Sequence, residues 1–199
     1  MYNIFLMYHL EPSGTQLKGA SIKARLDYLE EEHGPETLRE VLGCLPEGER
    51  SRLENGVLPS TWYPLELHGS LDGAIASVLD PMHPVEVFRV LGRASADRNL
   101  NSFHRIFLQG RDPKDVLASF PSIRRTNYSD GEASYQAVDE THVALCVSGA
   151  SGHTVADCAS TAGYFERAIE LLGGSSPTVE LSKCRERGDP VCEFLCSWH

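Results

Sequence analysis

Apolar residues recur every three or four positions through most of the first 120 residues, which is the spacing of amphipathic helices. Ile22, Leu26 and Leu29 show it, and Gly34 and Pro35 mark a boundary before the next helix. Ser60 is predicted to cap a helix that turns Trp62, Tyr63 and Leu67 inward. The predicted helices span 19–33, 35–45, 46–53, 60–67, 70–80, from 84 toward 108, and 112–120.

After residue 123 the pattern changes to a period of two. It predicts antiparallel strands over 124–128, 132–138 and 142–149, and then a helix over 154–172 that ends at Gly173-Gly174. Two further strands, TVELSKC and PVCEFLCSW, flank a turn at 187–189. We therefore predict an α+β fold in a single domain, residues 1–199. Its first part, 1–120, is mainly helical, and its second part, 121–199, holds a twisted antiparallel sheet, one helix and a hairpin.

The chain is acidic, with 18 Lys and Arg against 28 Asp and Glu, a net charge of −10 among 199 residues. Proteins that neutralise phosphates need the opposite sign, so binding to DNA, RNA or an anionic membrane is disfavoured. The short apolar run near the start follows no basic residue and does not resemble a signal peptide. We expect a cytoplasmic protein, whose thiols stay reduced.

Five of the six cysteines follow residue 145, namely Cys146, Cys158, Cys184, Cys192 and Cys196. Cys184 and Cys192 flank the predicted turn, Cys192 and Cys196 share a strand face, and Cys158 lies in the first turn of the following helix. Three or four thiols that converge there can bind Zn²⁺ tetrahedrally. Packing is the alternative, since free cysteine is among the most buried residue types and no CxxC pair is present.

The segment KCRERGDPVCEFLCSW resembles the closing motif of the 4-vinyl-reductase domain, and the preceding Ala-Gly-Tyr-Phe at 162–165 fits it too. In relatives that sense aromatic effectors, this domain holds zinc with a helix Cys, a Glu and two hairpin Cys. The resemblance therefore implies ligation by Cys158, Cys184 and Cys192. Leu181 stands where the family has its Glu. The candidates for the fourth ligand are Cys196, which we place first, Cys146 and Glu180 on a bulged strand.

Three longer segments, LKGASIKARLDYLEEEHG, STWYPLELHGSL and VEVFRVLGRASADRN, resemble a myxobacterial family of unknown function. That family is related to the 4-vinyl-reductase domain, within a superfamily that joins haem–nitric-oxide sensors with TRAPP vesicle-tethering subunits. The resemblance implies N-terminal helices beside a twisted antiparallel sheet, with an internal apolar cavity. It implies no reaction, and the chain contains no GxSxG, P-loop, GxGxxG or HExxH motif.

We expect the cavity between the helices around 84–108 and the sheet, with an aromatic wall. The candidate ligand-binding residues are Phe88, Phe103, His104, Phe107 and Tyr135. The predicted function is non-catalytic sensing of a small apolar or aromatic molecule, or protein interaction, with output through a homodimer or a signalling partner and with a structural zinc. The alternatives are a haem- or tetrapyrrole-binding protein, in which His104 can ligate the iron, and a TRAPP-like dimeric scaffold.

Overall fold

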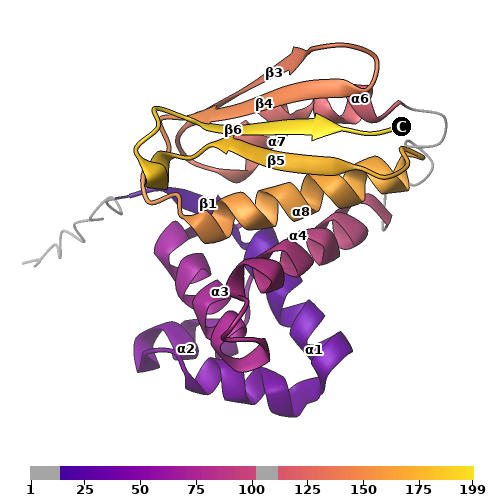
Figure 1. Ribbon diagram of the computed structural model, residues 1–199. Helices are drawn as coiled ribbons and strands as arrows, with labels where there is room; N and C mark the ends of the chain where they lie inside the picture. The colour runs from indigo at the N-terminus through magenta and orange to yellow at the C-terminus, as the bar shows by residue number, and fades with distance from the viewer. Residues whose placement is uncertain (1–13, 102–111) are drawn as a thin grey trace, which may run out of the picture.

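The computed structural model describes residues 14–101 and 112–199 (Figure 1). In chain order its elements are β1 (Gln16–Lys18), α1 (Gly19–Gly43), α2 (Glu47–Glu54), β2 (Trp62–Pro64), α3 (Leu65–Leu79), α4 (Pro84–Asn101), α6 (Pro113–Leu117), α7 (Phe120–Asn127), β3 (Glu132–Ala137), β4 (His142–Ser148), α8 (Val155–Leu171), β5 (Thr178–Lys183), a 3-10 turn (Arg185–Arg187) and β6 (Cys192–Ser197). Phe103, His104 and Phe107 lie outside the described residues.

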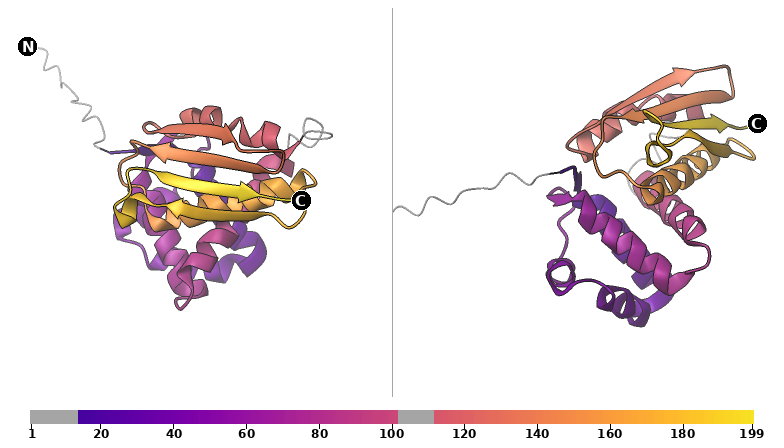
Figure 2. Two further views of the ribbon diagram at one scale, coloured as in Figure 1. Left: turned by 45° about the horizontal axis from the view of Figure 1, so that its top comes forward. Right: turned by 60° about the vertical axis from the view of Figure 1, so that its left-hand side comes forward.

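The helices α1, α2 and α3 form one half of the molecule, and the four-stranded sheet with α6, α7 and α8 forms the other (Figures 1 and 2). Helix α4 lies along α8 at the junction of the two halves. The helices gather on one face of the sheet, and the other face is open in the described part of the chain (Figure 2). This arrangement confirms the predicted α+β fold.

The sheet is antiparallel, with the strand order β3-β4-β6-β5. Alternate residues of β4 and β6 are buried, and Val147 pairs with Cys192, Leu145 with Phe194, and Val143 with Cys196. These residues share the sheet face that α8 covers, as the period of two predicts. The two predicted strands at the C-terminal end are confirmed as β5 and β6.

Helices α1 and α8 show how far periodicity alone can place boundaries. Helix α8 matches its prediction, and its Thr154–Asp157 capping box fixes where it begins. The two helices predicted on either side of Gly34 are also present: they are joined end to end as the element α1, and Gly34 between them takes the non-helical angles φ 82° and ψ 167°. Only glycine adopts such a φ readily, so Gly34 ends the first helical stretch and the chain bends there, as the sequence predicts.

Two local predictions were wrong. Residues 120–127 form the helix α7 rather than a strand over 124–128, and only Tyr128 forms a bridge, to Leu17. A five-residue segment is too short for its period to separate the two structures. Ser60 caps no helix, because Trp62 to Pro64 pair with β1 and α3 begins at Leu65.

Trp62 was predicted to turn inward, but it is not a core residue. It is 40% exposed, and the Lys18 ammonium lies 3.8 Å from its ring centroid. Its neighbour Tyr63 is buried as predicted, and the Tyr63 hydroxyl accepts a hydrogen bond from the Leu58 backbone N–H.

Helices α4 and α8 touch backbone to backbone where they cross. A Cβ added to Gly92 would lie 1.9 Å from the Ser160 carbonyl oxygen, and one added to Gly163 would lie 2.1 Å from that of Arg89. Both glycines are therefore required by close approach rather than by conformation. Ion pairs flank the crossing, from Arg89 to Glu166 and from Arg93 to Glu170.

No helix within the described ranges combines the length and the apolar character needed to cross a membrane.

Candidate functional site

A pocket of about 400 Å³ lies between α1, α4, α7 and α8, where the two halves of the molecule meet. Its apolar wall includes Leu100, Leu117, Phe120 and Phe165, and the rings of Phe120 and Phe165 meet edge to face at 4.9 Å. The predicted cavity shares α4 with this pocket. Its other walls are helices rather than strands, because α8 covers the inner face of the sheet.

Arg25 of α1 is buried in the wall of this pocket and joins four helices. Its Nε donates to Asp72 of α3 at 2.9 Å, and its Nη1 donates to the Leu91 carbonyl at 3.1 Å and to the Ser95 hydroxyl at 2.6 Å, both on α4. Its Nη2 donates to the Ser160 hydroxyl of α8 at 2.6 Å and lies 3.4 Å from the second Asp72 oxygen. All five guanidinium N–H groups therefore have acceptors.

The Arg25–Asp72 pair is almost sealed from water, with side chains 4% and 1% exposed. Burial alone would raise the pKa of the Asp72 carboxyl, but the charges of Arg25 and His68 and the Arg25 hydrogen bond together lower that pKa. Asp72 is therefore held as a carboxylate, and it neutralises Arg25 inside the protein.

His68 of α3 lines the same pocket and is 3% exposed. Its Nδ1 lies 3.8 Å from an Asp72 oxygen and 3.7 Å from Asp157 Oδ1, which is too long for hydrogen bonds. Neither ring nitrogen has a hydrogen-bond partner among the described residues. Asp157 is fixed by the capping box of α8, since its Oδ2 accepts from the backbone N–H and the hydroxyl of Thr154.

More buried polar groups surround the start of α8. Burial raises the pKa of Tyr128, which lines the pocket, to about 12, so its phenol stays protonated. The Arg124 guanidinium stacks 4.2 Å from the Tyr128 ring centroid, and its Nε and Nη2 have no partner in the described part of the chain. His153 is buried with both ring nitrogens likewise unpartnered, and burial lowers its pKa, which favours the neutral ring.

Of the five predicted ligand-binding residues, Phe88 and Tyr135 lie among the described residues. Phe88 packs at the edge of the helical core, and Tyr135 packs against the core beneath the sheet; neither lines the pocket. Phe103, His104 and Phe107 fall in the undescribed segment 102–111.

The second candidate site is a group of three buried thiols. The sulfur atoms of Cys158, Cys184 and Cys192 all lie within 4.8 Å of one another, and those of Cys158 and Cys192 are 3.4 Å apart. Cys158 comes from the first turns of α8, Cys192 begins β6, and Cys184 follows β5 just before the 3-10 turn. Burial and the other two cysteines raise the pKa of Cys158, so without a metal its thiol is protonated.

The three candidates for a fourth ligand lie elsewhere. Cys196 is buried on the same sheet face, but Phe194 separates it from Cys192 along β6, and burial raises its pKa to about 12. Cys146 has its sulfur 3.6 Å from a Glu193 carboxylate oxygen. Glu180 is exposed opposite Leu195, because the bulge in β5 falls between Leu181 and Lys183 and so does not reorient it.

Sequence reasoning missed the buried polar residues of the pocket. Arg25 continues the apolar stripe begun by Ile22, and His68 and Asp72 are four apart on α3, between buried leucines and Ile75. Charged residues at core positions of an amphipathic helix are the signal that could have found them, since such residues are almost never fully buried unless paired.

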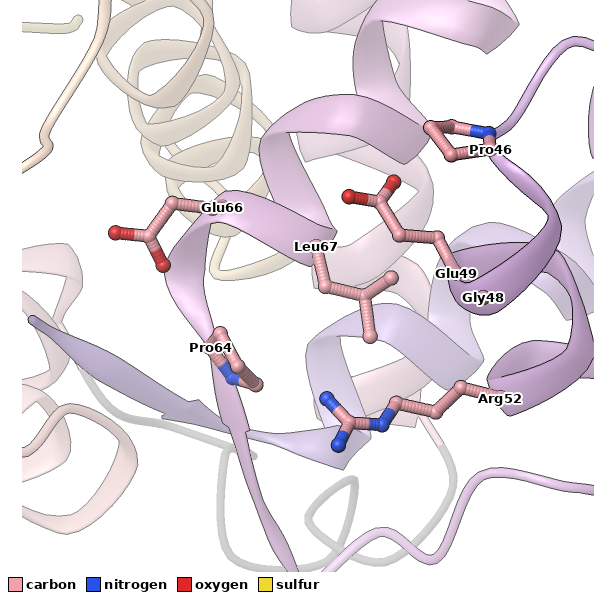
Figure 3. Close-up of a pocket in the computed structure, with 7 residues that line it drawn as sticks. All are labelled: Pro46, Gly48, Glu49, Arg52, Pro64, Glu66 and Leu67. Carbon is pink, nitrogen blue, oxygen red and sulfur yellow. The ribbon is translucent and has the colours of Figure 1, made fainter. Parts of the chain in front are cut away.

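A surface groove of about 290 Å³ also lies between α2 and the start of α3 (Figure 3). It is lined by Pro46, Gly48, Glu49, Arg52, Pro64, Glu66 and Leu67. Of these, only Leu67 is buried. The interhelical pocket, with its larger volume, aromatic wall and buried polar groups, is the better candidate for a ligand site.

No family model matches the chain, and no curated protein matches it significantly. Several solved structures, in contrast, are similar to the chain. The H-NOX protein from S. oneidensis in the Fe(II)NO ligation state is 13% identical, with 92% of this chain and 99% of that chain covered and a TM-score of 0.72. The Fe(II) unliganded H-NOX protein from K. algicida is 14% identical, with 92% and 97% covered and a TM-score of 0.68.

A further structure, from a study of heme distortion in the H-NOX family, is 13% identical, with 92% and 95% of the two chains covered and a TM-score of 0.66. At this level of identity the likeness concerns the fold alone. The chain therefore shares the α+β fold of the H-NOX proteins over nearly its whole length.

Proposed function

We propose that this chain is a small-molecule-sensing domain whose ligand occupies the pocket between α1, α4, α7 and α8, and that haem is the first occupant to test. The pocket carries the proposal: its volume of about 400 Å³ falls within the range typical of ligand sites. The likeness to H-NOX proteins solved with NO bound to Fe(II) favours haem over the apolar or aromatic effector expected from the sequence.

The pocket residues fit such a group. Leu117, Phe120 and Phe165 offer an apolar and aromatic wall for a flat ring system. His68 also lines the pocket, but both of its ring nitrogens are buried. Bound haem would supply an iron centre able to take a diatomic gas. Arg25 has no free N–H group for a ligand, so its part is to fix the surrounding helices.

Titration of the purified protein with haemin tests the proposal. We expect saturation near one equivalent, with a shifted and sharpened Soret band. Ser21→Trp, which places an indole in the pocket lining, should weaken binding at least about tenfold, equivalent to about 1.4 kcal/mol. Lys23→Trp, on the same helix but outside the lining, is the matched control and should bind like the wild type.

His104 is the candidate iron ligand of the haem alternative and lies outside the described residues, and His104→Ala belongs in the same titration. Failure of the wild type to bind haemin would contradict the haem assignment. Binding that Ser21→Trp leaves unchanged would place the occupant elsewhere.

We also propose that Cys158, Cys184 and Cys192 bind a structural zinc ion. The mutual approach of their sulfur atoms supports this, because three thiolates supply three of the four positions of a tetrahedral site. Cys196, predicted as the fourth ligand, is not in this group, and no fourth His, Cys, Asp or Glu joins it within the described ranges. Binding would release the proton that the Cys158 thiol, with its raised pKa, otherwise retains.

Cys184→Ser should release zinc and lower the melting temperature sharply, because a structural zinc contributes on the order of 10 kcal/mol to folding. Cys44→Ser, at an exposed cysteine of the helical half, should change neither quantity. Elemental analysis and thermal denaturation make the comparison. If the wild-type protein contains no metal and Cys184→Ser melts at the wild-type temperature, the proposal is wrong and the three cysteines only pack in the core.

A further inference from the structure

We propose that the pocket selects an aromatic ligand that carries a protonated amine, and that Asp157 is the residue that recognises this amine. The proposal rests on the proposed function, because it assumes that a small ligand enters the pocket, but it does not require that ligand to be haem. It names the chemistry of the ligand's head group and the residue that distinguishes this group from others.

Asp157 carries the charge that the pocket leaves open to a ligand. Apart from His68, Arg25 and Asp157 are the only basic and acidic side chains among the described lining residues. Arg25 is neutralised by Asp72, and its N–H groups all donate to protein acceptors. The neighbouring Arg124 does not line the pocket, and its Nε and Nη2 are sealed in the packing. A ligand therefore meets an available carboxylate but no available cation, which favours a positively charged head group and disfavours an anionic one.

The two carboxylate oxygens of Asp157 differ in what they contact. Oδ2 accepts from the Thr154 backbone N–H at 2.8 Å and from its hydroxyl at 2.9 Å. Oδ1 accepts no hydrogen bond in the described part of the chain, where His68 Nδ1 lies 3.7 Å away. The side chain of Asp157 is only 5% exposed, yet Oδ1, unlike the ring nitrogens of His68, is not sealed from water. Because Asp157 lines the pocket, this oxygen opens into it and can accept a hydrogen bond from an occupant.

Hydroxyl groups near Asp157 can accept the remaining N–H groups of an amine. Thr161 lies one turn after Asp157 on α8, and its hydroxyl, like that of Tyr128, lines the pocket without a hydrogen-bond partner among the described residues and without being sealed. Burial and the charge of Asp157 raise the pKa of Tyr128 to about 12, so its phenol stays protonated and its oxygen still accepts. A protonated primary amine has three N–H donors, and this corner of the pocket supplies acceptors for them.

The lining of α8 changes from polar to apolar along one face. Asp157, Thr161 and Phe165 are four residues apart, so they share that face, and Phe165 lies about 12 Å beyond Asp157 along the helix axis. Phe120 and Leu117 extend the apolar end. A ligand with an aromatic ring at this end and an ammonium at the other matches both. The net charge of −10 also attracts cationic ligands to the protein.

Calorimetric titrations at pH 7 with three naphthalene probes test the proposal. The compounds 1-naphthylmethylamine, 1-naphthalenemethanol and 1-naphthoate share one ring system and differ in the charge of the head group. The wild type should bind the amine at least about tenfold more tightly than naphthoate, with the alcohol between them. Asp157→Asn should remove this preference. Asp115→Asn makes the same change of charge at an exposed position of α6 outside the lining, and it should keep the preference.

The outcomes separate this proposal from the proposed function. A wild-type protein that binds naphthoate as tightly as the amine, or that does not bind the amine, overturns the amine preference and leaves the haemin titration to decide the function. An Asp157→Asn variant that keeps the preference overturns the role of Asp157. If that variant does not fold, Asp157→Gln makes the comparison, because Gln also suits this position of a capping box.

Ser21→Trp shows where the amine binds. It should weaken binding of the amine, since it places an indole in the pocket lining. Unchanged binding of the amine would place it outside the pocket and overturn this proposal. The pocket itself is contradicted only if Ser21→Trp also leaves haemin binding unchanged.

Discussion

Replacing Gly92 by alanine is expected to destabilise the protein by more than about 3 kcal/mol, the largest effect that we predict for a single added methyl group. Overpacking of a well-packed interior typically costs about 1–3 kcal/mol. Here the new Cβ would lie 1.9 Å from the Ser160 carbonyl oxygen and 2.9 Å from the Tyr164 backbone nitrogen. Backbone atoms cannot rotate away as a side chain can, so α4 and α8 would have to separate along their whole contact.

Urea denaturation followed by circular dichroism measures this change. Gly73→Ala is the matched control, because Gly73 is an exposed glycine inside α3 and its added Cβ would meet nothing within 4 Å. Because alanine has a higher helix propensity than glycine, this control should raise the free energy of unfolding by up to about 1 kcal/mol. A Gly92→Ala protein as stable as the wild type would show that the two helices do not cross this closely.

The second large effect is expected for Asp72→Ala, which should lower the free energy of unfolding by about 3–5 kcal/mol. The substitution leaves the Arg25 guanidinium charged and without its carboxylate partner in the interior. The double variant Arg25→Met with Asp72→Leu should recover much of that loss, since apolar residues often replace a buried ion pair at little cost. Asp27→Ala, which removes a surface partner of Lys23, should cost less than about 1 kcal/mol.

The same pair predicts a dependence on pH. The folded-state pKa of Asp72 is lowered, whereas an Asp in the unfolded chain titrates near about 3.9. The carboxylate therefore stabilises the fold fully above that value, and the contribution is lost as the pH falls through the lower folded-state pKa. Denaturation between pH 2 and 6 should show a smaller acid dependence for the Arg25→Met, Asp72→Leu double variant. Equal acid dependence of the two proteins would contradict the role of Asp72.

Much of the fold could be predicted from local patterns because those patterns report burial directly. The alternation of β4 and β6 follows the period of two, and the Thr154–Asp157 capping box marks the start of α8. The wrong helix start at Ser60 lies where tertiary pairing decides the structure. Residues 62–64 pair with β1, which is distant in sequence, and no local signal distinguishes that pairing from the start of a helix.

The two candidate sites differ in how much of each could be predicted from the sequence. The hairpin turn and the helix start bring Cys158, Cys184 and Cys192 together, and both could be located from the sequence. The pocket depends instead on how α1, α3, α4 and α8 are placed around Arg25, which the spacing along any one helix does not encode. The sequence analysis did not single out His68, and only the packed structure shows that its ring nitrogens are buried without a hydrogen-bond partner among the described residues.

The central claim, that the pocket between the two halves holds the ligand, is tested most directly by the location of a bound paramagnetic probe. Backbone amide spectra of the protein with haemin, compared with those of the zinc-porphyrin complex, report which residues lie near the iron. The account predicts that the signals of Ala24, Ser160 and Tyr164, which line the pocket, broaden beyond detection, while those of Gly48 and Glu49 in the surface groove persist. Broadening centred on the surface groove, or none at any residue, would contradict it.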